Sequence, residues 1–403
     1  GEIERADRYA RLGIELGRQL QSTFVQSVGF MRLGHAVLLY AQHPFNEDGL
    51  AQAMKLYQEA IDRVDVTRIH VEPLWGVCRA LGYTHHIQQA EQVALESLEI
   101  AKKAGDEWIS ILIQRALVVG EVLTGNYEAA QQYLTTAETS AFKVKDIFAL
   151  GAARMWLALR AWKQGYQNTA FGYLEKMLPT VQEYGYEFLL TRESLMGLKD
   201  REMIYPLLLA AAENNIEHPF ISKLLKDRGL EPETYHPGYS LWVQTFGGFK
   251  VWRGDQPVDP EEWKREKARL LFQLLVGHRD KWLHRDQIIS MLWPDTPLEN
   301  ANNYLKVILN TLNQVLEPDR PRGENAFFVE RRQELYRLNP KARVMVDAEL
   351  FTQQIGDGSL PALESAVNLY QGRYFDGCYA QEWLMIDVQY YHQQFLLAAR
   401  KST

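Results

Sequence analysis

Cysteine is scarce in this sequence, which holds only Cys78 and Cys378 among 403 residues. Two cysteines so far apart argue against a disulfide framework and a cysteine zinc site, and they favour a reducing, cytoplasmic location. Long apolar runs are missing as well: none approaches the roughly 18 residues that a membrane-spanning helix needs, so no membrane partner is expected. The first residues are charged and helical in pattern, unlike a signal peptide, and they begin abruptly, as in a fragment of a longer protein.

Catalytic and metal-binding motifs are also missing. The chain has no GxxxxGK[ST] phosphate loop, no HExxH, no GxSxG and no Cys/His cluster with zinc spacing. His85 and His86 are adjacent, and adjacent side chains point to different sides of a helix, so they predict no metal site. Because no nucleophile is paired with a base, the sequence predicts a protein that is not an enzyme and that needs neither a cofactor nor a metal.

Charge is distributed unevenly along the chain. The whole chain has a net charge of −7, whereas residues 239–341 hold 16 Lys and Arg against 14 Asp and Glu, a net charge of +2. The basic balance therefore lies in one segment. It is a modest excess, and it gives only a weak electrostatic indication of a nucleic-acid partner.

Residues 1–230 are dominated by apolar residues at helical spacing. The predicted helices are 3–20, 22–40, 47–64, 70–82, 86–104, 107–124, 127–144, 147–164, 167–184, 187–197, 201–215 and 219–228. A weak period of 43 and 40 residues relates Gly82, Gly125 and Gly165, each expected before a new helix. This pattern predicts a helical-repeat solenoid whose concave surface binds a partner protein, a peptide or a small effector; a purely structural spacer is the alternative.

The pattern changes after a linker predicted at residues 231–240, which contains Pro232, Pro237 and Gly238. Residues 241–340 begin with strand-like runs and continue into a helix that ends at Gly277 and starts with a capping box between Asp259 and Glu262. The remaining elements are a helix at 285–292, a turn at 293–296, a helix at 297–316, and strands at 327–329 and 335–338 around a tip at 330–334. A helix–turn–helix followed by a hairpin predicts a winged helix.

The stretch TPLENANNYLKVILNTLNQVLE, residues 296–317, is predicted to form one amphipathic helix. Thr296 is the expected N-cap, Pro297 the first helical residue, and Glu299 the partner of Thr296 in a capping box. One face is apolar and consists of Ala301, Leu305, Ile308, Leu309, Leu312 and Leu316. The opposite face carries Asn303, Lys306, Asn310 and Asn313, flanked by Asn302, Val307 and Thr311.

Asparagine and lysine are suited to contacts with base edges and phosphates, so this polar face predicts a recognition helix for double-stranded DNA. The alternative is a surface helix with a solvated outer face. Further phosphate contacts are predicted for Lys264, Arg265, Lys267, Arg331 and Arg332. For the last two, the alternative is a surface ion pair with the flanking Glu330 or Glu334.

Several motifs carry a family resemblance. LxVxxFGGFxVWRGDxPV, WKREKARLLFQLLV, LHRDQIISMLWPD and ANNYLKVILNTLNQVLEP, over residues 240–340, resemble the OmpR-type winged helix of the Streptomyces antibiotic regulatory protein family. VDAELFTQQI, ALESAVNLYQGRYFDG and EWLMIDVQYYHQQFLLAARK resemble the start of the bacterial transcriptional activator domain. The units over residues 45–215 loosely resemble the tetratricopeptide-like repeats of MalT-type regulators.

The resemblance implies a bacterial transcriptional regulator, with RNA polymerase as a further partner and an ATPase module upstream of a fragment such as this one. One departure concerns Thr311, Asn313 and Gln314, which stand where the family pattern usually has arginines. Because arginine clamps phosphates and guanines in a bidentate manner, weaker DNA binding is expected here.

The sequence thus predicts a mainly α fold: a TPR-like helical solenoid (1–230), a linker (231–240), a winged helix–turn–helix domain of α+β type (241–340) and a short helical activator-domain segment (341–403). The predicted function is DNA-binding transcription regulation in the cytoplasm. A protein-interaction scaffold whose winged helix no longer binds DNA is the alternative, and salt-dependent binding to duplex DNA distinguishes the two.

Overall fold

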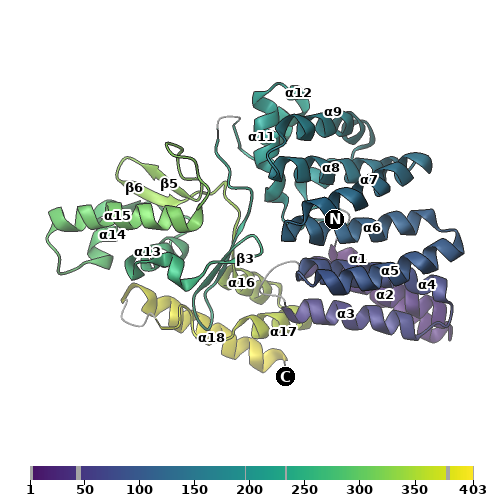
Figure 1. Ribbon diagram of the computed structural model, residues 1–403. Coiled ribbons are helices and arrows are strands. Elements are labelled where there is room, and N and C mark those ends of the chain that lie inside the picture. The colour runs from purple at the N-terminus through teal and green to yellow at the C-terminus, as the bar shows by residue number, and fades with distance from the viewer. Residues whose placement is uncertain (1–2, 42–46, 196, 232–233, 378–381, 403) are drawn as a thin grey trace. The chain divides into compact units, whose positions relative to one another are not determined.

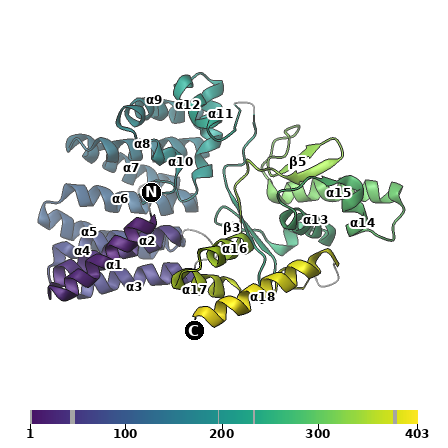
Figure 2. The ribbon, with the colours of Figure 1, turned by 180° about the vertical axis from the view of Figure 1, so that it is seen from behind.

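The computed structural model describes the chain except for residues 1–2, 42–46, 196, 232–233, 378–381 and 403. The described chain is mainly helical, with a small region of β-sheet late in the sequence (Figures 1 and 2). It divides into two compact units, Gly1–Glu233 and Thr234–Thr403. Among the described residues, no helix has the length and apolar character needed to cross a lipid bilayer. Cys378 lies outside the described residues.

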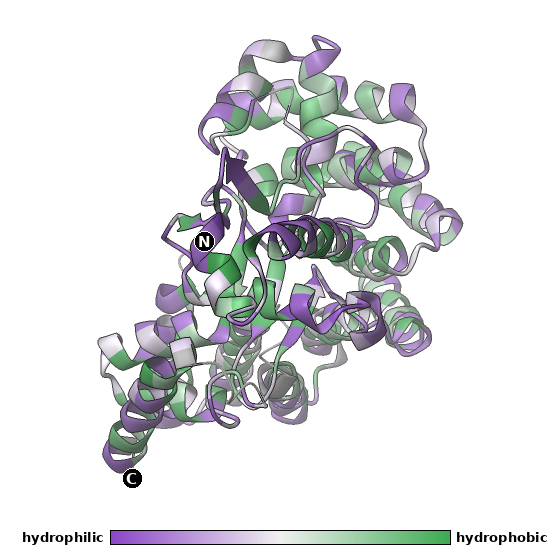
Figure 3. Ribbon diagram, turned by 90° about the vertical axis from the view of Figure 1, so that its left-hand side faces the viewer, coloured by the Kyte–Doolittle hydropathy of each residue, from purple (hydrophilic) through white to green (hydrophobic). Residues whose placement is uncertain are grey.

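The N-terminal unit consists of helices that pack on their neighbours in sequence, from α1 to α9. Three consecutive pairs of even-numbered helices also touch, namely α2 with α4, α4 with α6, and α6 with α8. The bounds are α1 Ile3–Gln19, α2 Thr23–Tyr40, α3 Glu47–Asp62, α4 Thr67–Tyr83, α5 Ile87–Ala104, α6 Glu107–Thr124, α7 Tyr127–Lys143, α8 Ile147–Lys163, α9 Gln167–Tyr184, α10 Phe188–Thr191, η1 Arg201–Ile204, α11 Tyr205–Glu213 and α12 His218–Lys226. In Figure 3, many helices of the chain carry both green apolar and purple hydrophilic residues, as amphipathic helices do.

Two of the three periodic glycines lie where the sequence places them. Gly125 and Gly165 follow helices α6 and α8 with φ near +80°, a conformation that glycine adopts at little cost. The prediction is wrong for Gly82, which lies inside α4 and not in a turn. There it faces Gly120 of α6, and the missing side chains let the two helices approach closely.

The helix predicted at residues 187–197 is also wrong, because α10 ends at Thr191. In the described residues that follow, 192–195 and 197–200, the chain is irregular, and it contacts α4. Arg79 on α4 donates a hydrogen bond from Nη2 to the carbonyl of Ser194 (3.1 Å), and Lys199 donates from Nζ to the carbonyl of Tyr83 (3.1 Å). These distant contacts replace the helical hydrogen bonds that the local pattern predicts.

The Tyr57 ring on α3 fills a space that two glycines leave open. A Cβ atom at Gly34 on α2 would lie 2.7 Å from Cε1 of the ring, and one at Gly76 on α4 would overlap the ring itself. The hydroxyl of Tyr57 is 2.9 Å from Nδ1 of the buried His35. Helices α2, α3 and α4 therefore meet at a contact without spare volume.

We expect Gly76→Ala to lower the free energy of unfolding by about 1–3 kcal/mol, because the added methyl group overpacks this contact. Gly151→Ala is the matched control: Gly151 is likewise helical and buried, but its Cβ would meet nothing within 4 Å. It should be neutral or stabilising by up to about 1 kcal/mol. Urea unfolding of both variants measures the difference, and equal midpoints would contradict the packing argument.

The C-terminal unit contains two small sheets. The first has the order β3-β2-β1-β7, formed by β1 Leu241–Gln244, β2 Lys250–Arg253, β3 Gln256–Pro257 and β7 Val344–Val346. The second has the order β4-β6-β5, formed by β4 Leu283–His284, β5 Val329–Arg332 and β6 Leu335–Leu338. The sequence pattern does not predict β7, which lies beyond residue 340 and pairs in parallel with β1. Residues on both sides of the predicted boundary at 340 thus share one sheet.

The helices of this unit are η2 Pro260–Trp263, α13 Glu266–Gly277, α14 Arg285–Leu292, α15 Leu298–Leu316, α16 Asp347–Asp357, α17 Leu360–Leu369, η3 Glu382–Leu384 and α18 Met385–Ser402. The predicted capping box of Asp259 and Glu262 is confirmed, but it caps the short η2. The single helix predicted up to Gly277 is wrong, because Lys264 has a φ of +53° and Arg265 is extended, so the helix restarts at α13.

Asp347 joins the end of β1 to the start of α16. Its buried carboxylate accepts hydrogen bonds from the backbone N–H groups of Thr245 (2.8 Å), Phe246 (3.0 Å) and Ala348 (2.8 Å), and from the Thr245 hydroxyl (2.5 Å). The ring of Phe246 then packs against Phe351 on α16, at a centroid distance of 5.3 Å. The helices after residue 341 and strand β1 therefore share a core.

Candidate nucleic-acid interface

Helix α15 is amphipathic as predicted. Its apolar face packs against α13, α14 and η2. Ala301, Leu305, Ile308, Leu312 and Leu316 of that face are buried, and Leu309 is half-buried. One face of this helix is thus held by the core, and the other is open to solvent.

The predicted start of α15 is wrong by one residue. The helix begins at Leu298, Pro297 is the N-cap, and no side chain caps it. The carbonyl of Pro297 accepts the first helical hydrogen bond from Ala301 (3.0 Å). Thr296 instead belongs to the turn, where its N–H donates to the carbonyl of Trp293 (3.2 Å), so the capping box with Glu299 does not form.

Three of the predicted contact residues present polar groups to solvent. Asn303, Lys306 and Asn310 are exposed, and within the described residues none of their side chains has a hydrogen-bond or ion-pair partner. Val307 lies beside them and is 46% exposed. The sequence interpretation missed Tyr304, which is 50% exposed between Asn303 and Lys306. Its position in the polar run 302–306 is the signal that could have identified it.

The other three predicted residues of α15 are less accessible. Thr311 is only 8% exposed, and its hydroxyl donates to the carbonyl of Val307 (3.1 Å), so its predicted flanking role is wrong. It lies next to Ile308 around the helix, at the rim of the apolar face. Asn302 and Asn313 are half-buried, and the side-chain oxygen of each is buried with no partner among the described residues.

Lys267 holds the turn between α14 and α15. Its Nζ donates to the carbonyl of Leu292 (2.6 Å) and lies 5.9 Å from the centre of the Trp293 ring. Trp293 in turn packs against Tyr304 of α15, at a centroid distance of 6.2 Å. Lys267 is half-buried and engaged within the protein, so it differs from the free phosphate contact that the sequence predicts. Its role here is to position the turn before α15.

Lys264 and Arg265 lie in the break between η2 and α13. Both are exposed, and within the part of the chain that the structure describes neither side chain has a hydrogen-bond or ion-pair partner. Their phosphate contacts stay a prediction, and the two residues do not lie on a helix.

The hairpin of β5 and β6 differs from the predicted tip at 330–334. Arg331 and Arg332 belong to β5, where they pair with Tyr336 and Leu335 of β6. The Arg331 Nε donates to the carbonyl of Gln333 (3.0 Å), and its guanidinium lies 5.6 Å from the centre of the Tyr336 ring. Arg332 is exposed, with no side-chain partner among the described residues.

The expected ion pairs of these arginines with Glu330 and Glu334 do not form. Glu330 pairs with Arg337 (2.8 Å), and Glu334 pairs with Arg285 at the start of α14. Both carboxylates near the end of the hairpin are therefore neutralised by other cations. Neither Arg331 nor Arg332 has a carboxylate partner among the described residues.

Glu317 sets the hairpin in place relative to α15. It is buried directly after the helix, and its Oε1 accepts from the backbone N–H groups of Phe327 and Phe328, both at 2.9 Å. From the other side, the Tyr239 hydroxyl donates to the carbonyl of Leu316 (2.7 Å). Tyr239 belongs to the predicted linker 231–240, which is thus packed here in part: His236 and Ser240 are buried.

The described residues offer little for other chemistry. Burial raises the pKa of the Cys78 thiol to about 12, which keeps it protonated and unreactive near neutral pH. In the described part of the chain, no group of three or more His, Cys, Asp or Glu side chains is arranged to hold a metal ion. The arrangement on α15 is suited to recognition by polar contacts.

No protein-family model matches the chain, and no curated protein matches it. The solved structures that are similar to it include BtubC (BKLC) from P. vanneervenii, with 14% sequence identity and a TM-score of 0.42. That match covers 56% of this chain and 89% of BtubC. A likeness at this level carries no argument about function.

Proposed function

We propose that the chain is a bacterial transcriptional regulator that binds double-stranded DNA through α15. In this proposal, residues 1–230 form a TPR-like solenoid that binds a partner protein or small effector, residues 241–340 form a winged helix–turn–helix domain, and residues 341–403 begin a bacterial transcriptional activator domain that contacts RNA polymerase. The observation that carries the proposal is the open polar face of Asn303, Lys306 and Asn310 on a helix whose apolar face is buried.

The chemistry of this face supports DNA recognition. An asparagine side chain can form two hydrogen bonds with adenine, one at N6 and one at N7, and a lysine can bind guanine or a phosphate. Lys264, Arg265 and Arg332 are exposed cations without side-chain partners in the described residues, and they would contact phosphates on either side. Together with Lys306 they make about four contacts, so the logarithmic slope of affinity against salt is expected to be about −3 to −4.

Selection of bound sequences from a random duplex pool by the intact chain would supply a target for the main test. We expect the double variant Asn303→Ala, Lys306→Ala to bind that duplex about thirtyfold more weakly, a loss of about 2 kcal/mol. The change leaves the buried face of α15 intact, so the fold should persist. Fluorescence anisotropy at fixed salt measures the loss.

The control is Lys103→Ala, which removes a lysine that is also exposed, from α5 in the N-terminal unit. It should bind the duplex as the wild type does. If the double variant keeps wild-type affinity, α15 is not the recognition helix. If selection yields no duplex at any salt concentration, DNA binding itself is refuted.

A protein-interaction scaffold is the second candidate, and one observation favours it. Leu298, Tyr304 and Val307 expose large apolar groups along α15, as a protein-binding helix does. The absence of arginine at Thr311, Asn313 and Gln314 points the same way. Failure to bind duplex DNA at low salt would favour this function, because phosphate contacts are strongest there.

A further inference from the structure

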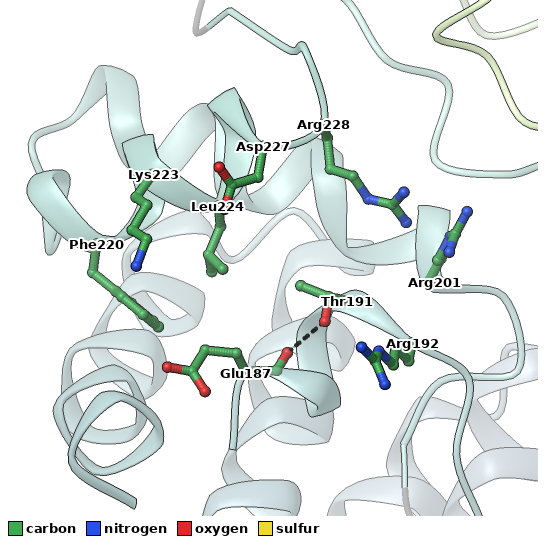
Figure 4. Close-up of a pocket in the computed structure, with 9 residues that line it drawn as sticks. All are labelled: Glu187, Thr191, Arg192, Arg201, Phe220, Lys223, Leu224, Asp227 and Arg228. Carbon is green, nitrogen blue, oxygen red and sulfur yellow. Dashed lines mark hydrogen bonds between the residues drawn. The ribbon is translucent and has the colours of Figure 1, made fainter. Parts of the chain in front are cut away.

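A cavity of about 410 Å³ lies near the end of the N-terminal unit, between α10, η1 and α12 (Figure 4). Its size falls within the range of small-molecule sites, roughly 300–1,000 Å³. The side of the cavity formed by α12 includes Phe220 and Leu224, which are largely buried and offer an apolar surface. The cavity is therefore suited to a small molecule with an apolar part.

Basic side chains dominate the polar lining. Arg192, Arg201, Lys223 and Arg228 line the cavity, against the two acids Glu187 and Asp227. This local excess contrasts with the unit as a whole, because residues 1–233 hold 24 Lys and Arg and 30 Asp and Glu. A positive site on a negatively charged unit favours an anion over a cation.

The arginine head groups lie on one side of the cavity. In Figure 4 the guanidinium groups of Arg192, Arg201 and Arg228 lie on one side, whereas the carboxylate of Glu187 lies on the other, near Phe220. Several guanidinium groups on one side of a cavity can hold more than one anionic oxygen. The separation leaves the basic side of the cavity open to a ligand.

The donors of these arginines are only partly used. The Arg228 Nε donates to the Tyr205 hydroxyl (2.7 Å), whereas its Nη2 is buried with no hydrogen-bond partner among the described residues. Arg201 pairs through Nε with Glu202 (3.2 Å). The exposed Arg192 has no side-chain partner in the described part of the chain. A buried guanidinium nitrogen without an acceptor is costly, so Arg228 keeps unused donor capacity beside the cavity.

We propose that this cavity binds a small organic anion. Its phosphate or carboxylate oxygens accept hydrogen bonds from Arg192, Arg201 and Arg228, and its apolar body packs on Phe220 and Leu224. The role of this cavity as the effector site of a transcriptional regulator rests on the proposed function. Anion binding does not depend on that function, and it is measured without DNA.

Calorimetric titration of the full chain with three probes tests the chemistry of the site. Phenyl phosphate and benzoate each combine a ring with an anion, and phenol has the ring alone. We expect an anionic probe to bind at least tenfold more tightly than phenol, because charge-assisted hydrogen bonds carry the affinity. The stronger of the two anions identifies phosphate or carboxylate as the ligand group. Equal binding of phenol, or no binding of either anion, would overturn the proposal.

Three variants locate the binding. Arg192→Gln and Lys223→Gln each remove an exposed cation from the lining. We expect Arg192→Gln to weaken binding of the tighter anionic probe about tenfold, and Lys223→Gln to weaken it about fivefold. Lys226→Gln is the control, since Lys226 is exposed on the same helix but does not line the cavity. If all three variants bind as the wild type does, the anion lies elsewhere. Because no DNA is present, this failure would leave the DNA-binding proposal unaffected.

Discussion

Trp156→Ala is expected to lower the free energy of unfolding by about 3–5 kcal/mol. Trp156 lies in the middle of α8 and is fully buried. Helix α8 packs against α6, α7 and α9, so the surrounding helices cannot easily collapse into the space that the indole leaves. Urea unfolding followed by circular dichroism measures the loss without relying on the fluorescence of the missing residue.

Trp108 provides the matched control for this change. It lies in the first turn of α6 and is 48% exposed, so Trp108→Ala removes the same side chain without opening an enclosed cavity. Its cost should remain below about 1 kcal/mol. Similar costs for the two variants would show that the interior of α8 is less tightly packed than the structure indicates.

Asp347→Ala is expected to cost about 3 kcal/mol or more in the C-terminal unit. The change removes the carboxylate that accepts hydrogen bonds from four donors. These are the backbone N–H groups of Thr245, Phe246 and Ala348, and the Thr245 hydroxyl. These donors are buried, and water cannot replace the lost carboxylate without disturbing the join between β1 and α16. Thermal unfolding and urea unfolding should both report the loss.

Asp319→Ala is the control for the loss of an aspartate in the same unit. Asp319 is exposed just after α15, and no hydrogen bond of its side chain occurs among the described residues. Its replacement should change the free energy of unfolding by no more than about 0.5 kcal/mol. If Asp347→Ala unfolds like this control, the carboxylate is not what joins the strand to the helix.

Much of the helical part could be predicted because the signals are local. The predicted helices 107–124 and 167–184 match α6 and α9 at both ends. Apolar residues at helical spacing mark these segments, and their ends carry local signals such as Asp106, whose carboxylate accepts from the N–H of Ile109 at the start of α6. The helix at 285–292 and the strand at 335–338 are confirmed for the same reason.

The errors concern features that distant parts of the chain determine. Strand β7 has only three residues and exists because β1 offers it an edge, which no local pattern shows. The break at Lys264 likewise interrupts a stretch whose local signals favour one continuous helix. Tertiary contacts decide such cases, and a single sequence does not reveal them.

For the candidate interface, helical spacing in the sequence predicts which side of α15 is exposed but not how each side chain is used. Helical spacing separates the open side of α15 from its buried side, and this identifies Asn303, Lys306 and Asn310. Spacing cannot show how much of the helix surface the neighbouring elements cover, and they bury Thr311. It also cannot show that Lys267 is engaged by a carbonyl 25 residues further along the chain.

The irregular residues 192–195 and 197–200 have a consequence for how the N-terminal unit opens. In an array where each helix touches only its sequence neighbours, terminal helices can fray independently and stability is local. Here Arg79 and Lys199 bridge α4 to this segment across 115 and 116 residues. Opening of α4 breaks both of these hydrogen bonds, so we expect α4 and the chain after α10 to open together, whereas the helices before α4 have no share in these two contacts.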